Sequence, residues 1–199
     1  MVGRAATACF TLFWTCFVLI GCSAQSSYFT TVKRIPCDDC PNAVTYANGI
    51  QVRQITGEEG SDWFGLSQLD HDSVQKAVTG SLENNGTLAQ GGQSPRYALD
   101  IDVKAVKIRA GVARLNMRYT LIRLSDSRTV LDTELGTGAS AVGSNPNDLA
   151  AGAAIRENIR GFVYVLLTGK MPPQDAKGTL RERRTCTENC PQHVDPNRP

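Results

Sequence analysis

The fold of this chain is decided by three runs of sequence, YALDIDV at Tyr97–Val103, LNMRYTL at Leu115–Leu121 and TVLDTEL at Thr129–Leu135. In each run, apolar side chains alternate with polar ones, as expected for a strand that has one face on a core and the other in water. Short turn signals, Ala110-Gly111 and Ser125-Asp126-Ser127, separate the runs. The stretch therefore predicts an antiparallel meander of three strands.

The ends of these strands are less sharply marked than their centres. The first strand is expected to run on toward Ile108, and the third to fade into the glycine-containing residues 136–140. Ile122 breaks the alternation of the second strand, because Leu121 and Ile122 are both apolar. The register at that point is therefore ambiguous.

A strand and a helix are expected before the meander. Ile50–Ile55 follows the turn signal Asn48-Gly49 and is a short strand candidate. The helix begins at Asp70 or Asp72 and ends at Asn84-Asn85-Gly86. Its core-facing residues fall at helical spacing: Val74, Ala77, Val78, Ser81 and Leu82.

A second helix is expected after the meander. It opens near Asn145-Pro146-Asn147-Asp148 and ends at Gly169, ahead of Pro172-Pro173. Its apolar stripe is broad enough to cover a sheet and comprises Leu149, Ala153, Ile155, Ile159, Phe162, Val163, Leu166 and Leu167. The order βαβββα predicts an α+β two-layer sandwich at residues 49–169, with an antiparallel-rich sheet and both helices on one face. The first two strands would be parallel neighbours joined by a right-handed crossover.

The N-terminus is typical of an exported lipoprotein. Arg4 precedes an apolar run, Cys9–Ile20, which is too short to span a bilayer. The run ends in Leu19-Ile20-Gly21-Cys22, which resembles a lipobox. We therefore expect residues 1–21 to be a signal peptide and Cys22 to carry several acyl chains, which together make a stable membrane anchor. Residues 22–48 would then be a polar tether, and residues 170–199 a polar tail.

Four further cysteines lie outside the predicted core, in the pairs Cys37/Cys40 and Cys186/Cys190. An even number of thiols in an exported protein favours structural disulfides, within each pair or between the two pairs. Four thiolates could also bind zinc if the two ends of the chain met. A catalytic C-x-x-C pair is disfavoured, because the carboxylates of Asp38 and Asp39 oppose a thiolate.

No other residues indicate a catalytic, cofactor or metal site. His71 lies at the start of a helix beside acidic residues, where a solvated cap is the simplest interpretation. Gly136-Thr137-Gly138 lacks the spacing of a dinucleotide loop. Asp100 and Asp102 share the wet face of one strand and are more typical of a solubilising surface than of a carboxylate pair. The chain has 21 basic and 19 acidic residues without a basic patch interleaved with aromatics, which disfavours nucleic acid as a partner.

Residues 49–168 resemble small bacterial envelope lipoproteins with a βαβββα domain, similar to the N-terminal domain of TolB and to YajG-type and ABC-transport-auxiliary lipoproteins. The resemblance rests on VQKAVTGSLENNG at Val74–Gly86, YALDIDV at Tyr97–Val103, RYTLIRL at Arg118–Leu124 and the helix at Ala150–Leu167, which contains Ile155-Arg156-Glu157-Asn158-Ile159. It implies a non-enzymatic part of an envelope assembly. With Ser23 following Cys22, it also implies an outer-membrane protein that faces the periplasm.

The expected function is therefore that of a lipid-anchored structural or interaction module. Its partner would be another envelope protein or a second copy of the chain. Two features could make the contact: an open sheet edge, and the aromatic residues Trp63 and Phe64 of the loop that follows the first strand. The alternative is an auxiliary transporter subunit that carries a lipid or ligand in a groove between the helices and the sheet.

Overall fold

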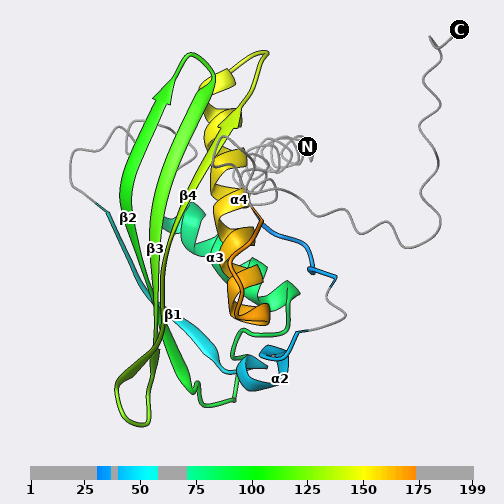
Figure 1. The fold of residues 1–199 in the computed structure, drawn as a ribbon, viewed down its shortest axis with the longest axis vertical. Coiled ribbons are helices and arrows are strands. Elements are labelled where there is room, and N and C mark those ends of the chain that lie inside the picture. The colour runs from blue at the N-terminus through cyan, green and yellow to red at the C-terminus, as the bar shows by residue number, and fades with distance from the viewer. Residues whose placement is uncertain (1–30, 37–39, 58–70, 174–199) are drawn as a thin grey trace, which may run out of the picture.

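Four strands form one open sheet in the computed structural model, which describes residues 31–36, 40–57 and 71–173 (Figure 1). They are β1 (Ile50–Gly57), β2 (Tyr97–Arg109), β3 (Val112–Arg123) and β4 (Arg128–Ser140), in the spatial order β1-β2-β3-β4. β1 is parallel to β2, and the other neighbours are antiparallel. The helices are α2 (Ala43–Tyr46), α3 (His71–Asn84) and α4 (Pro146–Thr168). The predicted βαβββα order and α+β class are confirmed.

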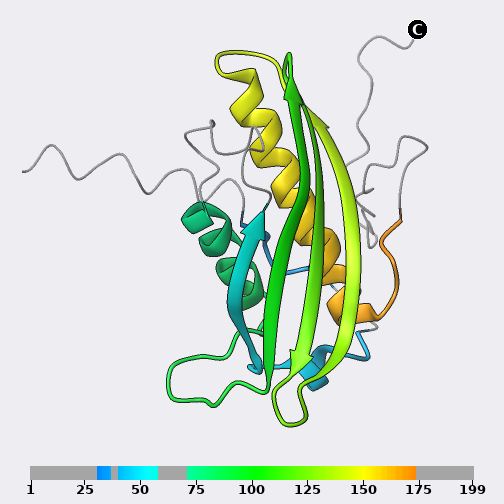
Figure 2. The same ribbon diagram turned by 90° about the vertical axis from the view of Figure 1, so that its left-hand side faces the viewer.

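Both long helices cover the same face of the sheet (Figure 2). α3 buries the five residues that its spacing predicts, Val74, Ala77, Val78, Ser81 and Leu82. Gly86 follows the helix at φ +68°, a conformation that costs glycine little. The expected helix stop at Asn84-Asn85-Gly86 is therefore confirmed.

α4 is the main cover of β3 and β4 (Figure 2). It begins at Pro146, where a missing N–H costs nothing, and ends at Gly169, whose N–H donates to the Val165 carbonyl at 2.8 Å. The predicted stripe is right from Ile155 onward, but Leu149 is 51% exposed and Ala153 is only partly buried. At this end of the helix, small residues face the core instead, namely Ala150, Ala151 and Ala154.

The turn between β2 and β3 is tight. Ala110 and Gly111 have φ values of +51° and +73°, as in the two-residue turns that match the twist of a hairpin. A Cβ on Gly111 would lie 2.5 Å from the Ala141 carbonyl oxygen, so only glycine fits without a shift. At the other end of β3, the ladder with β4 shifts register between Leu121 and Ile122, which accounts for the ambiguity in the sequence.

β4 is longer than its sequence pattern suggests. The strand does not fade after Leu135 but continues to Ser140, pairing with β3 as far as Val112. The side chain of Thr137 is buried, whereas Gly136 and Gly138 occupy the alternate positions. A Cβ on Gly136 would lie 2.9 Å from the Asn116 side-chain oxygen, so the glycine makes room for its cross-strand partner. Close approach between strands therefore outweighs the low strand propensity of glycine.

The described part of the expected tether lies against the domain. Val32 is 5% exposed, its N–H donates to the Ser81 hydroxyl at 2.9 Å, and its carbonyl accepts from the Asn84 side chain at 3.0 Å. Further along, the Asn42 N–H donates to the Leu167 carbonyl at 3.1 Å, just before the single turn of α2. These residues of the expected tether therefore pack against the core.

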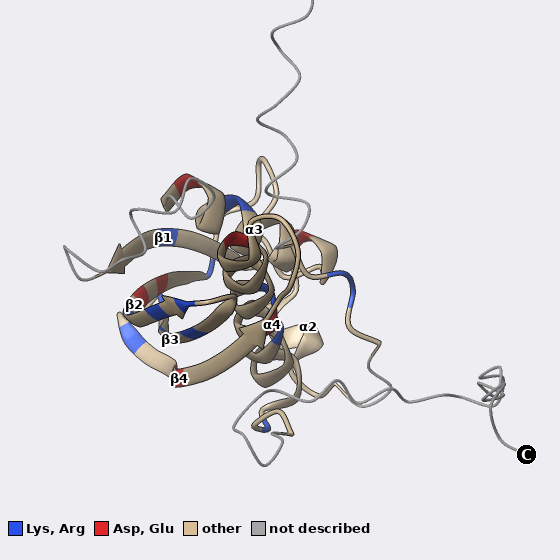
Figure 3. Cartoon of the chain, turned by 90° about the horizontal axis from the view of Figure 1, so that it is seen from above, with Lys and Arg blue, Asp and Glu red and all other residues tan. Residues whose placement is uncertain are grey.

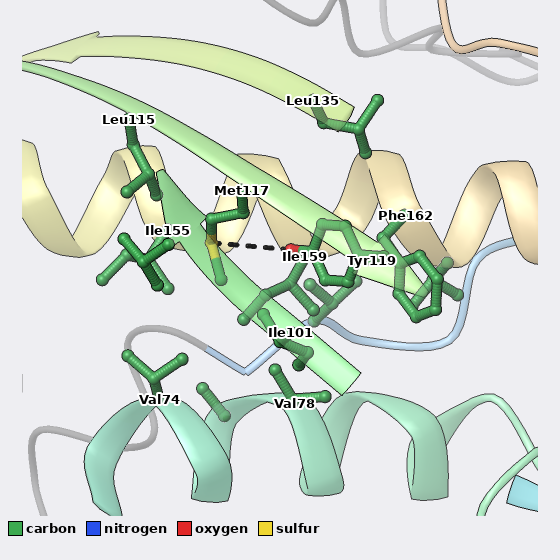
Figure 4. Packing of buried hydrophobic residues seen from close by; sticks show 14 of the residues in the cluster. Val74, Val78, Ile101, Leu115, Met117, Tyr119, Leu135, Ile155, Ile159 and Phe162 are labelled. Atoms are coloured by element: carbon green, nitrogen blue, oxygen red, sulfur yellow. Dashed lines mark hydrogen bonds between the residues drawn. The ribbon is translucent and has the colours of Figure 1, made fainter. Parts of the chain in front are cut away.

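The core lies between the sheet and the two long helices, and its centre is aromatic (Figure 4). Tyr119 of β3 stacks on Phe162 of α4, with ring centroids 4.2 Å apart and planes 6° from parallel. Around this pair lie aliphatic side chains from every layer, Val78, Ile101, Met117, Leu135 and Ile159, each at most 1% exposed. The predicted apolar faces therefore meet in a single cluster.

Candidate interaction surface

The face of the sheet opposite the helices carries the polar half of the alternating pattern, and we call it the open face (Figure 2). Along β3, every second residue from Val112 to Arg118 is exposed while its neighbours are buried. The register places the partners of these residues on the same face. The open face thus includes Asp100, Asp102, Lys107, Arg109, Val112, Arg114, Asn116, Arg118, Thr120, Asp132, Glu134, Gly136 and Gly138.

Most charges on the open face are paired across strands. Arg53 of β1 donates to both carboxylate oxygens of Asp100, through Nε at 2.7 Å and through its terminal nitrogen. Arg118 makes the same two-pronged contact with Asp132, at 2.8 Å and 2.5 Å. The hydrogen bond from Arg118 lowers the pKa of Asp132 and raises the pKa of Arg118. Because these groups are exposed, water and salt screen the attraction and each pair adds little stability.

Asp100 and Asp102 each contact a different cation. Asp100 is bound by Arg53, whereas Asp102 forms an ion pair with Lys104. Here each has its own cation, as on a solvated surface.

The sheet has an open edge on each side, within the described residues. Among the strands, β1 pairs with β2 alone, although its first residue, Ile50, also forms a short bridge with Leu88, and β4 pairs with β3 alone. β4 is the longer edge, with 13 residues. Beside its middle, the Thr133 hydroxyl lies 3.9 Å from the Met171 sulfur, so the chain that leaves α4 passes next to this strand. An unpaired edge offers backbone donors and acceptors to an added strand.

A buried polar cluster that the sequence analysis missed lies under α4. The Tyr119 hydroxyl donates to the Asn158 side-chain oxygen at 2.8 Å, and the Asn158 amide donates to the Leu135 carbonyl at 2.7 Å and to the Thr137 hydroxyl at 3.2 Å. Thr137 in turn donates to the Ala154 carbonyl at 3.0 Å. All three polar side chains are at most 5% exposed, and burial raises the pKa of Tyr119.

This cluster is structural. Its polar side chains hydrogen-bond to one another and to backbone carbonyls, as buried polar groups usually do. The cluster ties α4 to both β3 and β4 and fixes how the helix lies on the sheet. The sequence signal is a single amide, Asn158, among the apolar residues of the buried face. Its partners are 21 and 39 residues away in sequence.

Most residues that the sequence singled out lie outside the described part of the chain: Cys22, Cys37, Trp63, Phe64, Cys186 and Cys190. Cys40 is described, packs at the border of the core and is disulfide-bonded. His71 is the first residue of α3 and is partly exposed. Gly136-Thr137-Gly138 lies inside β4, so it forms no phosphate-binding loop.

Neither a metal-binding cluster nor a membrane-spanning helix is found among the described residues. No cluster of three or more His, Cys, Asp or Glu side chains could hold a metal ion there. None of the helices in this part is both long enough and apolar enough to cross a membrane.

Comparisons with known proteins show a shared fold and little more. No protein-family model matches the sequence, and no curated protein is significantly similar to it. Protein XCC0632 from Xanthomonas campestris, of the family DUF330, is 19% identical, with a TM-score of 0.52 over 70% of this chain and 93% of that one. A PelC dodecamer from Paraburkholderia phytofirmans is 15% identical (TM-score 0.44, 63% of this chain and 90% of that one).

A protein from Caulobacter crescentus that is described as a candidate lipoprotein is 13% identical, with a TM-score of 0.39 over 63% of this chain and 92% of that one. The scores of the PelC and Caulobacter proteins are too low to support an argument. The likeness to the Xanthomonas protein establishes that this chain has the same fold as a bacterial protein of the family DUF330.

Proposed function

We propose that this chain is a lipid-anchored, non-enzymatic interaction module of a bacterial cell envelope, held at the outer membrane through Cys22 and facing the periplasm. The anchor is supported by the apolar run that ends in Leu19-Ile20-Gly21-Cys22. The interaction role rests on one observation above all: within the described residues, the 13-residue strand β4 pairs with β3 on one side and with no strand on the other.

The partner is another envelope protein, or a second copy of this chain, that adds a strand to β4. Strand addition draws its affinity from backbone hydrogen bonds and its specificity from alternate side chains. Around Gly136 and Gly138, β4 has no side chain on the open face. A partner strand at this end could therefore bring bulky side chains close to the sheet.

The packing under α4 argues for this role and against that of a lipid or ligand carrier. A carrier would need a groove between helix and sheet. Instead, Ile155, Ile159 and Phe162 fill that interface and are at most 1% exposed. An enzymatic role has no support among the described residues, where the buried polar groups Tyr119, Thr137 and Asn158 serve one another.

The anchor is tested by Cys22→Ser. This variant should lose palmitate labelling and move from the membrane to the soluble fraction, because the lipobox-like run then lacks the cysteine that would be acylated. Cys37→Ser is the matched control and should keep both the label and the membrane fraction. Unchanged labelling of Cys22→Ser would contradict the anchor. Sucrose-gradient fractionation of the parent protein then decides between the inner and outer membranes.

The edge is tested by photo-crosslinking in intact cells. A photoreactive residue at Ser140, exposed at the end of β4, should capture a defined protein or a second copy of the chain. The control position is Gln90, which is exposed in the loop between α3 and β2. Equal capture from both positions would show that β4 is not a specific docking edge.

A further inference from the structure

One end of the open face carries positive charges without acidic partners. Lys107 and Arg109 of β2 and Arg114 of β3 are exposed, and within the described residues none of them forms an ion pair. β4 supplies no acidic side chain there, since Gly138 lies opposite Arg114 and Ser140 opposite Val112.

Figure 3 shows the basic segments of β2 and β3 in blue. Elsewhere on this face, Arg53, Lys104 and Arg118 are each paired.

The strand register places two of these positive charges next to each other, which lowers the stability of the protein when no anion is bound. Lys107 and Arg114 are direct cross-strand partners in the antiparallel ladder. Like charges opposite one another destabilise a sheet, whereas opposite charges stabilise it. Asp148, in the first turn of α4, forms no ion pair with any of the three within the described residues. An external anion would therefore supply what this end of the sheet lacks.

Exposed apolar side chains surround the same end. Val112 is 46% exposed on the open face, Val142 is 91% exposed in the loop after β4, and Leu149 is 51% exposed in α4. The Ala141 N–H donates to the Gly111 carbonyl at 2.8 Å, and the Gly111 N–H donates to the Asn147 side chain at 2.8 Å. These bonds hold the loop and the start of α4 against the β2–β3 turn, at the top of Figure 1.

We propose that this end, the basic tip formed by Lys107, Arg109, Val112, Arg114, Val142 and Leu149, docks on an anionic lipid surface. Cations contact the head groups, while the aliphatic side chains enter the boundary between head groups and acyl chains. A nucleic-acid site would pair its cations with aromatic stacking platforms. The exposed apolar residues of the tip are instead all aliphatic.

The position of the tip is compatible with the proposed anchor, on which this inference builds. Thr31 lies against Gly80 of α3, with its methyl carbon 3.1 Å from the position of a Cβ there. Nine steps of chain separate Cys22 from Thr31, which span at most about 30 Å when fully extended. The membrane is therefore close to the domain, and the basic tip decides which end of the domain meets it.

The experiment reports the depth of the tip in a membrane. The full, acylated chain is reconstituted into vesicles of phosphatidylcholine alone or mixed with phosphatidylglycerol, with bromine on the acyl chains as a quencher of tryptophan fluorescence. Val142→Trp places the probe at the tip. Val44→Trp is the matched control, because Val44 is 85% exposed in α2, at the opposite end (Figure 1). The signal of the parent chain, which keeps Trp63 after the signal peptide is removed, is subtracted.

We expect the probe at position 142 to shift to the blue and to be quenched in anionic vesicles only, while the probe at position 44 stays unchanged. Adding Lys107→Gln, Arg109→Gln and Arg114→Gln should remove the effect. At about 1 kcal/mol per basic side chain, the ratio of docked to undocked chains falls on the order of 100-fold. The melting temperature of the triple variant should be equal to that of the parent chain or higher, because the repulsion between Lys107 and Arg114 is removed.

Three results would overturn the docking: no quenching at position 142 in anionic vesicles, equal quenching at position 44, or full quenching in a folded triple variant. Flotation of the parent chain with neutral vesicles reports the anchor separately. A chain that floats without quenching at position 142 overturns the docking and leaves the anchor standing. A chain that does not float with neutral vesicles overturns the anchor, and the anionic vesicles still decide the docking.

Discussion

Tyr119 is the residue at which the polar and apolar parts of the core meet. Its ring stacks on Phe162, and its hydroxyl donates to Asn158 at 2.8 Å. A buried hydroxyl with a good acceptor adds about 1 kcal/mol, but the same groups left without partners cost about 1–3 kcal/mol. The phenol is fully buried, and burial raises its pKa.

This pKa shift predicts a loss of stability in alkali. Below about pH 10 Tyr119 keeps its proton in both the folded and the unfolded chain, so the contribution to stability is complete. Above that pH the unfolded chain loses the proton first, because the folded-state pKa is the higher one. The free energy of unfolding should then fall by up to about 1.4 kcal/mol per pH unit from this residue alone.

Urea denaturation at a series of pH values above neutrality measures this slope. Tyr119→Phe should be less stable at neutral pH, because Asn158 loses its donor, but its stability should fall less steeply in alkali. Parallel pH profiles of the two proteins would show that another group controls the alkaline transition.

The polar cluster marks the limit of what could be predicted from single residues. The amide of Asn158 is visible in the sequence among apolar neighbours, but its partners belong to two strands that come earlier in the chain. Only the register of β3 against β4 and the rotation of α4 bring these groups together. The residue pattern along a single helix or strand carries no information about hydrogen bonds to side chains on other elements.

At the scale of elements, α4 contributes most to the packing over the antiparallel part of the sheet. From Ile155 onward the apolar stripe of the helix follows its sequence period, and the same period in α3 gave every buried position correctly. The sequence-based predictions were wrong at two places, where the spacing of apolar residues does not determine the structure. Leu149 is exposed because the start of α4 reaches the end of the sheet, and β4 continues through glycines because their small size lets Asn116 fit.

Phe162→Ala tests the packing of α4 on the sheet. The side chain is fully buried and stacked on Tyr119, so its loss should cost about 3–5 kcal/mol through lost transfer energy and a cavity. Arg160→Ala is the control on the same helix. Arg160 is partly exposed and pairs with Glu157 at 3.3 Å, so its loss should cost less than about 1 kcal/mol. Similar melting temperatures for the two variants would refute this packing.

At the scale of the whole molecule, the covalent cross-link lies outside residues 49–169. Cys40 is disulfide-bonded, and residues 49–169 contain no cysteine. The stability of that part comes from apolar faces buried between the helices and the sheet. The sequence alone leaves the pairing of Cys37, Cys40, Cys186 and Cys190 undecided, because connectivity depends on distances in space.

Reduction should therefore loosen the ends of the chain and leave the βαβββα core folded. We expect no free thiol in the oxidised protein on alkylation under denaturing conditions, and no bound metal. Hydrogen exchange after reduction should speed up around Cys40 while β3 and α4 keep their protection. Four alkylatable thiols together with about one equivalent of zinc would favour the metal site instead.

The parallel pairing of β1 has a consequence for the order in which the chain folds. Ile50 pairs with Tyr97, and the Arg53–Asp100 contact joins residues 47 positions apart, whereas β2, β3 and β4 are joined by short turns. Closing a long loop costs entropy before its contacts form, so local hairpins form sooner. The meander and α4 would make the folding nucleus, and β1 would join last. By the same reasoning, β1 would be the first strand to detach in partial unfolding, and it would then uncover the edge of β2.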